Sequence, residues 1–343
     1  MKKALIAMSG GVDSSAAAYL TLREGCDCQG VMLWLFGEEK PAAAADAEAV
    51  ARALGIPFAL VDARDAFRRE VVDVFAREYM AGRTPNPCVR CNETIKFGLM
   101  TELLRDFDAD VLVTGHYARI ERDEQGLYRL CRAKNRAKDQ SYFLYMLSPE
   151  QLRHIRFPLG DFADKDAVRA LAEAAGLPTA KRKDSQDVCF LPEGDYAAFL
   201  RGRGEALIPG DFVDRNGKVL GRHEGLAAYT RGQRKGLGVS ASARLYVLEK
   251  DAEHNTVLLG DDAELFSSAL LAEDLRLFSE LPERVSCKTR YSQREAQARL
   301  TPAGNGLRVD FFEPQRALTP GQAVVFYDGE RVLGGGTISE YIE

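Results

Sequence analysis

The chain has 343 residues, of which 46% are hydrophobic and 28% charged, and its net charge is −5. This length predicts about two or three domains, and the composition is that of a soluble globular protein with an ample core. No apolar run approaches the ~20 residues that cross a bilayer, and no secretory pattern follows Met1-Lys2-Lys3. The seven cysteines are an odd number, which favours free thiols over a secreted disulfide framework. We therefore expect a cytoplasmic protein that does not insert into a membrane.

Short apolar runs alternate with amphipathic stretches over the first half of the chain. The predicted strands are 3–8, 30–35, 58–62 and 110–115, and the predicted helices are 14–24, 41–54, 66–80, 92–104 and 165–175. This alternation is typical of a parallel sheet covered by helices on both faces. Ligands of such sheets bind beyond the carboxyl ends of the strands, where residues 9–14 and 114–116 would lie.

The sequence changes character after about residue 200, where short β-like runs are separated by turn pairs such as Asn216-Gly217 and Asp328-Gly329. The stretch 285–338 alternates polar and apolar residues, which predicts a small all-β barrel or sandwich. We therefore expect an α/β catalytic domain over 1–200, a small central domain over 201–265 and a C-terminal all-β barrel over 266–343.

The segment Ser9-Gly10-Gly11-Val12-Asp13-Ser14 joins the first predicted strand to the first predicted helix. Glycines allow the main chain to turn tightly and to approach an anion closely, and the helix start directs N–H groups and a positive dipole to the same place. The loop lacks the lysine of a P-loop and the glycine spacing of a dinucleotide site. These features predict a phosphate-binding loop of a less common kind.

Basic residues gather in three clusters, although the net charge is negative. The clusters are 129–138 (Arg129, Arg132, Lys134, Arg136, Lys138), 181–183, and Arg231 with Arg234 and Lys235. Each cluster alone is typical of a solvated surface. Because all three lie beside loop signals, RNA binding is an equal alternative.

A second motif, Thr84-Pro85-Asn86-Pro87-Cys88-Val89-Arg90-Cys91-Asn92, precedes the helix predicted over 92–104. The two prolines predict a stiff, irregular loop. The dipole of the following helix and the charge of Arg90 would both favour the reactive thiolate. A metal clip or an inert turn is the alternative. Cys189 alone would be interpreted as a small buried hydrophobe, and Cys26, Cys28, Cys131 and Cys287 are predicted to be packing residues.

The loop at 9–14 resembles the signature of ATP pyrophosphatases, which split ATP between its α- and β-phosphates. When further motifs are included, the resemblance extends over nearly the whole chain and is to tRNA-specific 2-thiouridylases. These enzymes place sulfur on C2 of the wobble uridine. These motifs are residues 9–15, 84–92, 95–97, 114–118, 138–144, 184–190, 229–238, 288–291, 320–327 and 334–336.

The resemblance implies a role for each matching residue. Cys91 matches the nucleophile and Cys189 the cysteine that carries persulfide sulfur. The implied ATP-binding residues are Ala7, Met8, Ser9, Gly10, Gly11, Val12, Asp13, Ser14, Leu33 and Gly115. The implied tRNA-binding residues are Asn86, Pro87 and Cys88 at the target base, and His116, Lys138, Asp139, Gln140, Arg290, Tyr291 and Gln322 elsewhere.

The resemblance also implies ATP with Mg²⁺ as the nucleotide, the anticodon arm of tRNA as the substrate, and a sulfur donor such as a cysteine desulfurase or a relay protein. The uridine O2 would be adenylated, and sulfur would then come from the persulfide on Cys189, with either hydrosulfide release or a disulfide between Cys91 and Cys189. Two alternatives have a different function: another ATP-pyrophosphatase ligase acting on RNA or an amide, and a non-enzymatic RNA-binding or sulfur-carrier protein. The intact phosphate loop counts against the last.

Cys88 departs from the family pattern, which commonly has Asp after Asn-Pro. Three thiolates, from Cys88, Cys91 and Cys189, would suit a [4Fe-4S] cluster with one open iron or an incomplete zinc site. The alternative, which we favour, is that Cys88 is a tolerated replacement beside an ordinary persulfide relay.

Overall fold

The computed structural model describes residues 1–182, 188–191, 195–241 and 243–343. These residues form two compact units. Unit 1 comprises Met1–Val71, Cys88–Gln186 and Asp328–Val332, and unit 2 comprises Val72–Pro87, Asp187–Tyr327 and Leu333–Glu343. None of the helices among the described residues combines the length and apolar character that crossing a bilayer requires.

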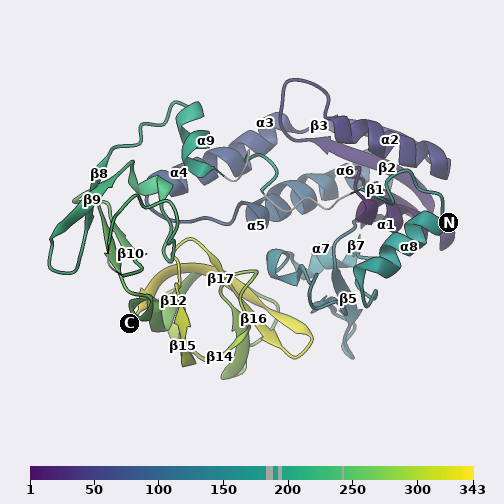
Figure 1. The fold of residues 1–343 in the computed structure, drawn as a ribbon. Helices are drawn as coiled ribbons and strands as arrows, with labels where there is room; N and C mark the ends of the chain where they lie inside the picture. The colour runs from purple at the N-terminus through teal and green to yellow at the C-terminus, as the bar shows by residue number, and fades with distance from the viewer. Residues whose placement is uncertain (183–187, 192–194, 242) are drawn as a thin grey trace. The chain divides into compact units, whose positions relative to one another are not determined.

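Unit 1 is built on a five-stranded parallel sheet in the order β3–β2–β1–β4–β7. Strands β1, β2, β3 and β7 are labelled in Figure 1. Strand β1 pairs in parallel with both β2 and β4. Successive side chains of a strand face opposite sides, so Leu5 and Ile6 are fully buried on the two faces. The strands are β1 (Lys3–Ala7), β2 (Asp27–Trp34), β3 (Phe58–Asp62), β4 (Val111–Val113) and β7 (Ile155–Arg156). This confirms the expected parallel α/β fold.

Helices follow the strands of unit 1, and a hairpin of β5 (Ala118–Arg122) and β6 (Tyr128–Arg132) follows β4. Local signals set several helix ends: α8 is capped by Asp164, which accepts from the Ala167 N–H, and α2 ends at Gly55 in the left-handed region. The helices are α1 (Val12–Arg23), α2 (Ala42–Leu54), α3 (Arg64–Phe67), α5 (Pro87–Cys91), α6 (Met100–Asp106), α7 (Pro149–Arg153) and α8 (Lys165–Ala174), with a 3-10 turn η3 (Ser141–Phe143).

Two expected helices contain π-helical segments. The stretch predicted as 66–80 is α3, the π-segment η1 (Arg68–Val72) and α4 (Asp73–Met80), and the stretch predicted as 92–104 is η2 (Asn92–Leu99) followed by α6. At Gly98 an added Cβ would lie 2.9 Å from the Glu93 carbonyl oxygen, so glycine accommodates the wide turn of η2.

The prediction of a stiff, irregular loop over 84–91 is wrong for its second half, because helix α5 begins at Pro87. Proline suits the first turn of a helix, since its fixed φ is helical and no intrahelical partner exists there for an N–H. Cys88 and Cys91 therefore lie on a helix and not on a loop.

Among the residues that the structure describes, unit 2 contains two β-structures and the helices α4 and α9 (Tyr196–Gly202). A four-stranded sheet has the order β10–β11–β8–β9, with β11 parallel to β8 and the other pairs antiparallel. Its strands are β8 (Gly210–Val213), β9 (Val219–His223), β10 (Tyr246–Asp251) and β11 (Thr256–Gly260), with 3-10 turns η5 (Leu226–Ala228) and η6 (Asp262–Leu265).

The C-terminal strands of unit 2 form the expected barrel, drawn in green to yellow in Figure 1. They follow the order β12–β15–β14–β13–β16–β17, and β12 also pairs with β17, which closes the barrel. Phe326 and Val309 are fully buried in its core. The strands are β12 (Phe266–Leu277), β13 (Arg284–Lys288), β14 (Ala296–Ala303), β15 (Gly306–Arg316), β16 (Ala323–Asp328) and β17 (Arg331–Ile342).

Candidate active site

The loop between β1 and α1 is shaped by its own glycine and serine residues. Gly10 has φ +70°, and a Cβ there would lie 2.4 Å from the Ala43 carbonyl oxygen, so the position requires glycine. Ser14 Oγ accepts from the Ser9 N–H at 3.1 Å and donates to the Gly11 carbonyl at 3.1 Å. Helix α1 has no side-chain cap at its start, which leaves its first N–H groups available to an anion.

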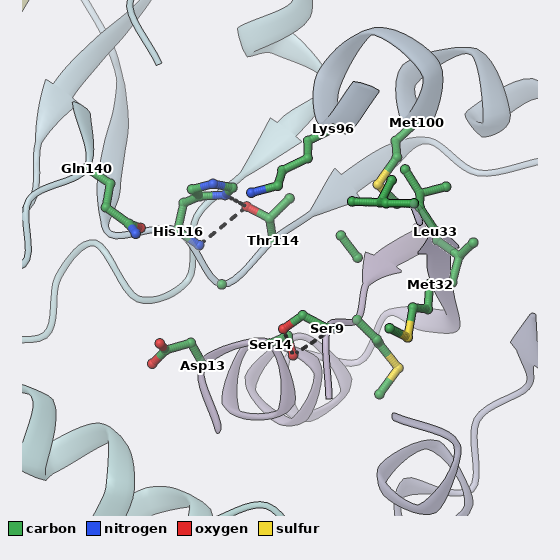
Figure 2. A pocket seen from close by; sticks show the side chains of 15 residues that line it. Ser9, Asp13, Ser14, Met32, Leu33, Lys96, Met100, Thr114, His116 and Gln140 are labelled. Carbon is green, nitrogen blue, oxygen red and sulfur yellow. Dashed lines mark hydrogen bonds between the residues drawn. The ribbon is translucent and has the colours of Figure 1, made fainter. Parts of the chain in front are cut away.

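A pocket opens beside this loop, and its two sides differ in chemistry (Figure 2). One side is apolar, from Val31, Met32, Leu33, Leu35 and Met100; the other is polar, from Ser9, Asp13, Ser14, Lys96, Thr114, His116 and Gln140. Of the ten expected ATP-binding residues, Ala7, Met8, Ser9, Asp13, Ser14, Leu33 and Gly115 line the pocket, while Gly10, Gly11 and Val12 belong to the same turn. An apolar wall for a base and a polar end for phosphates suit a nucleotide.

Asp13 contributes the only carboxylate among the described residues that line the pocket, and two side chains of unit 1 contact it. Lys165 Nζ lies 2.5 Å from both carboxylate oxygens, and the Tyr117 hydroxyl donates to Oδ1 at 2.8 Å. Neither Lys165 nor Tyr117 was predicted as a site residue. Their positions depend on tertiary packing, which brings the start of α8 to the loop.

Gly115 closes the pocket next to the phosphate loop. A Cβ at Gly115 would lie 2.7 Å from the Asp13 carbonyl carbon and 2.7 Å from the Ser14 nitrogen. Real Cβ atoms do not approach backbone that closely, so only glycine lets the end of β4 pack against the start of α1.

His116 is held as a neutral imidazole. Burial is the main cause that lowers its pKa well below the ordinary value, and the Lys96 charge adds to the effect. Its Nδ1 lies 2.8 Å from Thr114 Oγ1, and Phe97 packs with its ring centroid 5.4 Å away.

The neighbouring expected tRNA contacts differ in exposure. Asp139 is buried and accepts from the Ala133 N–H at 3.0 Å and the Ser141 hydroxyl at 2.8 Å. Gln140 accepts from the Tyr117 N–H at 2.9 Å and also lines the pocket. Lys138 is half-buried.

The two cysteines of α5 have different environments. Cys91 is buried and Cys88 is exposed by surface area. Desolvation by the surrounding protein nevertheless raises the pKa of the Cys88 thiol, and the Lys96 charge opposes this shift. Arg90 contacts Glu70 at 2.8 Å and Glu93 at 3.3 Å. Its charge is therefore balanced by two carboxylates, contrary to the expected free cation beside the thiols.

Cys189 is exposed, whereas its neighbours are anchored within unit 2. Leu191 is buried in an apolar cluster with Phe75 and Leu200, and the Phe190 ring meets Phe75 edge-on at 5.3 Å. The preceding motif residues 184–187 and the basic residue at 183 lie outside the described residues. The remaining cysteines, Cys26, Cys28, Cys131 and Cys287, are buried, which confirms the packing role predicted for them.

The first basic cluster is largely neutralised within unit 1. Arg129 pairs with Asp123 at 2.8 Å, Lys134 pairs with Asp161 at 2.8 Å, and Arg136 pairs with Glu330. Arg132 is buried and donates to the Gly329 carbonyl. In the other two clusters, Arg182 pairs with Asp46 and Arg231 is buried against the Tyr341 ring, whereas Lys181, Arg234 and Lys235 are exposed.

Several expected tRNA contacts of unit 2 also make contacts within the unit. Arg290 donates to the carbonyls of Arg231 at 3.2 Å and Ala317 at 3.1 Å. Gln322 donates a hydrogen bond of 2.8 Å to the carbonyl of Thr84. Thr84 lies just ahead of Asn86 and Pro87 in the sequence. Tyr291 packs under Lys288, whose Nζ is 5.4 Å from the ring centroid.

In the part of the chain that the structure describes, no group of three or more His, Cys, Asp or Glu side chains could hold a metal ion. Cys88 and Cys91 supply two thiols on one helix, and we derive no step through an iron–sulfur cluster.

The fold and the pocket together define a nucleotide-binding α/β domain joined to β-structured modules, and comparisons with known proteins agree. Residues 2–193 match a model described as tRNA methyl transferase HUP domain. Residues 197–261 match tRNA methyl transferase PRC-barrel domain, and residues 267–338 match Aminomethyltransferase beta-barrel domain.

Relatives with curated names specify the family. The tRNA-specific 2-thiouridylase of Carboxydothermus hydrogenoformans is 45% identical over 99% of this chain and 98% of its own length. That of Moorella thermoacetica is 46% identical over 97% of this chain and 98% of its own. The chain therefore belongs to the tRNA-specific 2-thiouridylase family. Among solved structures, a 4-thiouridine synthetase–RNA complex with bound ATP is similar at 18% identity and a TM-score of 0.39, over 55% of this chain and 44% of that one.

Proposed function

We propose that this protein thiolates the wobble uridine of tRNA in two steps, adenylation of the uridine O2 and sulfur transfer from a persulfide on Cys189. As a member of its family, it is a transferase that carries out ATP-dependent 2-thiolation of tRNA uridine. The observation that carries the proposed mechanism is the pocket that joins the phosphate loop to an apolar wall. The domain division proposed with it is 1–200, 201–265 and 266–343.

The pocket supports one orientation of ATP. Its base would lie on the apolar side near Leu33 and Met100, and its phosphates would face the loop at Ser9 and Ser14. Mg²⁺ would bind to the phosphates themselves, because Lys165 contacts both oxygens of Asp13, the only carboxylate among the described residues that line the pocket. When bound, Mg²⁺ neutralises phosphate charge. Ser9, Gly10, Gly11 and the start of α1 supply the donors that position the pyrophosphate.

Adenylation needs the uridine out of the anticodon stack so that O2 is exposed. A bond forms between O2 and the α-phosphorus, while the bond from the α-phosphorus to pyrophosphate breaks and its electron pair leaves with pyrophosphate. The N3 proton passes to water, which leaves a neutral adenylated base. Asn86, Pro87 and Cys88 are the proposed contacts of the base, and His116, Lys138, Asp139, Gln140, Arg290, Tyr291 and Gln322 the proposed contacts of the anticodon arm.

Sulfur transfer would begin when a donor protein, a cysteine desulfurase or a relay protein, places a persulfide on the exposed Cys189. The terminal sulfur bonds to C2, and the C2–O2 bond breaks to release AMP. Cys91 then attacks the Sγ of Cys189. The bond between this Sγ and the sulfur on C2 breaks, and the sulfur stays on the base as the C2 thiocarbonyl. The resulting Cys91–Cys189 disulfide needs two electrons from a thiol reductant. Alternatively, Cys91 attacks the persulfide first and releases hydrosulfide.

The test is reaction of tRNA with ATP and a persulfide donor, followed by nucleoside and nucleotide analysis. We expect 2-thiouridine and AMP; ADP as the nucleotide product would contradict the adenylation step, and 4-thiouridine would indicate a different ligase. Cys91→Ser and Cys189→Ser should form the adenylate but no thiolated base. Cys88→Asp, which restores the residue that the family commonly has at this position, should retain thiolation.

The same protein, purified without oxygen, distinguishes the persulfide relay from an iron–sulfur enzyme. An iron-free, colourless preparation that thiolates tRNA would support the relay. A brown preparation that loses both iron and activity in Cys88→Asp would show instead that Cys88 is a cluster ligand.

A further inference from the structure

We propose that Lys96 is a catalytic residue that neutralises the α-phosphate of ATP as the uridine is adenylated. This inference rests on the proposed function and adds a residue to it. Lys96 lines the pocket together with Ser9 and Ser14 of the phosphate loop and Thr114 and His116 after β4. In Figure 2 its side chain extends from the helix toward Thr114 and His116, on the opposite side of the pocket from the loop.

Lys96 is the only lysine or arginine among the described residues that line the pocket. A nucleotide triphosphate carries several negative charges, and the backbone N–H groups of the loop supply only partial positive charge. The full positive charge of Lys96 is therefore larger than that of any other donor in the described lining, and the surrounding protein screens it less than bulk water would.

The other cations near the pocket are already engaged within unit 1. Lys165 contacts both carboxylate oxygens of Asp13, Arg182 pairs with Asp46, and Arg90 contacts Glu70 and Glu93. Lys96 differs from them, since none of the described residues forms a hydrogen bond or an ion pair with it. A half-buried ammonium without a protein counter-charge is the arrangement expected when the counter-charge belongs to the ligand.

The backbone holds Lys96 in a fixed register. Ile95 and Phe97, on either side, are 1% and 0% exposed and anchor the helix in the core. The residues belong to the π-helical segment η2, whose wide turn is made possible by Gly98. π-helical segments occur often at functional sites, and Lys96 of η2 lines the nucleotide pocket.

The charge of Lys96 is felt at two groups that face this region. It lowers the pKa of His116, after burial, and it opposes the burial that raises the pKa of Cys88. Both effects are those expected of a positive charge that lies close to His116 in the nucleotide pocket and to Cys88 at the start of α5. An oxyanion that develops there would be stabilised by the same charge.

The charge of Lys96 acts more strongly on the transition state than on bound ATP. As O2 approaches and pyrophosphate departs, negative charge concentrates on the oxygens around the α-phosphorus. Lys96 interacts more strongly with that distribution than with the ground state, so its removal should lower the rate more than the affinity for ATP.

The experiment measures single-turnover AMP formation from ATP by the full chain with bound tRNA. Lys96→Met should slow adenylation by about 10²–10³-fold, the effect typical of a lost charge-stabilising donor. Its dissociation constant for ATP should rise by a smaller factor than the rate falls, because the ground-state phosphate also carries negative charge. Lys96→Arg should retain part of the rate, and n-propylamine should restore part of the rate of Lys96→Ala.

Sulfur-substituted ATP provides a readout that a structural role would not affect. In the parent, one diastereomer of adenosine 5′-(α-thio)triphosphate should react more slowly than ATP, because sulfur weakens the contact with the ammonium. In Lys96→Met this slowing should disappear for that diastereomer alone. The matched control is Lys40→Met, an exposed lysine that pairs with Glu48 at 3.7 Å outside the pocket lining, and it should behave as the parent.

Three results would overturn the role of Lys96: a parent-like adenylation rate in Lys96→Met, a loss entirely in ATP affinity, or an unchanged effect of sulfur substitution. Failure of the proposed function is distinguishable from all three, because the parent itself would then yield no AMP.

Discussion

Lys165 Nζ lies 2.5 Å from both carboxylate oxygens of Asp13, the acidic residue of the phosphate loop. The Lys165 side chain is 12% exposed and that of Asp13 is 32% exposed, so the two charges neutralise each other in a partly dry site. The Tyr117 hydroxyl completes the arrangement by donating to Asp13 Oδ1 at 2.8 Å. The loop is thus fixed to the start of α8 before any nucleotide binds.

The first prediction concerns the stability of this pair. Asp13→Ala should lower the free energy of unfolding by about 1–3 kcal/mol, less than for a fully buried pair, because Asp13 keeps solvent contact. The loss arises because the Lys165 ammonium stays poorly solvated without a partner. The double variant Asp13→Ala/Lys165→Met should regain part of the lost stability. Urea denaturation of the parent, the two single variants and the double variant measures this. Strictly additive effects would mean that the two charges are not coupled.

The second prediction is that Gly115→Ala impairs ATP binding. The new Cβ would lie 2.7 Å from the Asp13 carbonyl carbon and the Ser14 nitrogen, so the loop would have to move. We expect ATP affinity to fall at least about tenfold, since backbone donors act only over short distances. Isothermal titration of ATP checks this.

Gly202→Ala is the control for that experiment, because a Cβ there meets nothing within 4 Å. It should leave ATP affinity unchanged. Parent-like affinity in Gly115→Ala would show that the loop tolerates the displacement.

The sheet and the phosphate loop were predictable because their signals are local. The apolar run at β1 and the glycines that follow it define a strand, a tight turn and a helix start within a few residues. Pro87 shows the limit of the same reasoning: a proline can end a helix or begin one, and only the following turn decides. The π-segments η1 and η2 have no comparable sequence signal beyond Gly98.

The charges of the site were harder to predict, because ion pairs join residues that are distant in sequence. Arg136 appears in the sequence as part of a free basic cluster, yet it pairs with Glu330 at the other end of the chain. Lys96, by contrast, belongs to the motif at 95–97 but was assigned no role from the sequence, and only the folded pocket shows that it is the one cation of the described lining. The sequence pattern identifies the basic side chains, but the tertiary structure decides which of them form ion pairs within the protein.

The third prediction concerns Gln322, which contacts the segment ahead of α5. Its Nε2 donates to the carbonyls of Thr84 at 2.8 Å and Pro85 at 3.3 Å, and the Thr84 N–H donates to Pro320 at 2.9 Å. Gln322→Ala should therefore loosen this segment in the free protein. We expect faster hydrogen exchange of the peptide that contains Thr84, and thiolation that is slower even at saturating tRNA.

Gln297→Ala is the matched control, an exposed glutamine on β14 of the same barrel, and it should change neither quantity. Unchanged exchange in Gln322→Ala, together with weaker tRNA binding, would mean that Gln322 acts on the RNA and not on the segment.

The last prediction is a pH dependence that originates at His116. Its pKa is lowered in the folded protein, first by burial and then by Lys96, whereas the unfolded chain has the ordinary value of about 6.5. Below that value the unfolded state binds a proton that the folded state does not, so stability is fully present above about pH 6.5 and falls as the pH is lowered. His116→Gln should have a flatter profile between about pH 5 and 7, measured by urea denaturation at each pH. The His116 resonance is identified as the imidazole signal that is lost in His116→Gln. In the parent this signal should not titrate near pH 6.5. In Lys96→Met the pKa of His116 should be higher than in the parent. A parent resonance that titrates near 6.5 would show that His116 is solvated and charged in the acidic range, contrary to its desolvation beside Phe97 and Lys96.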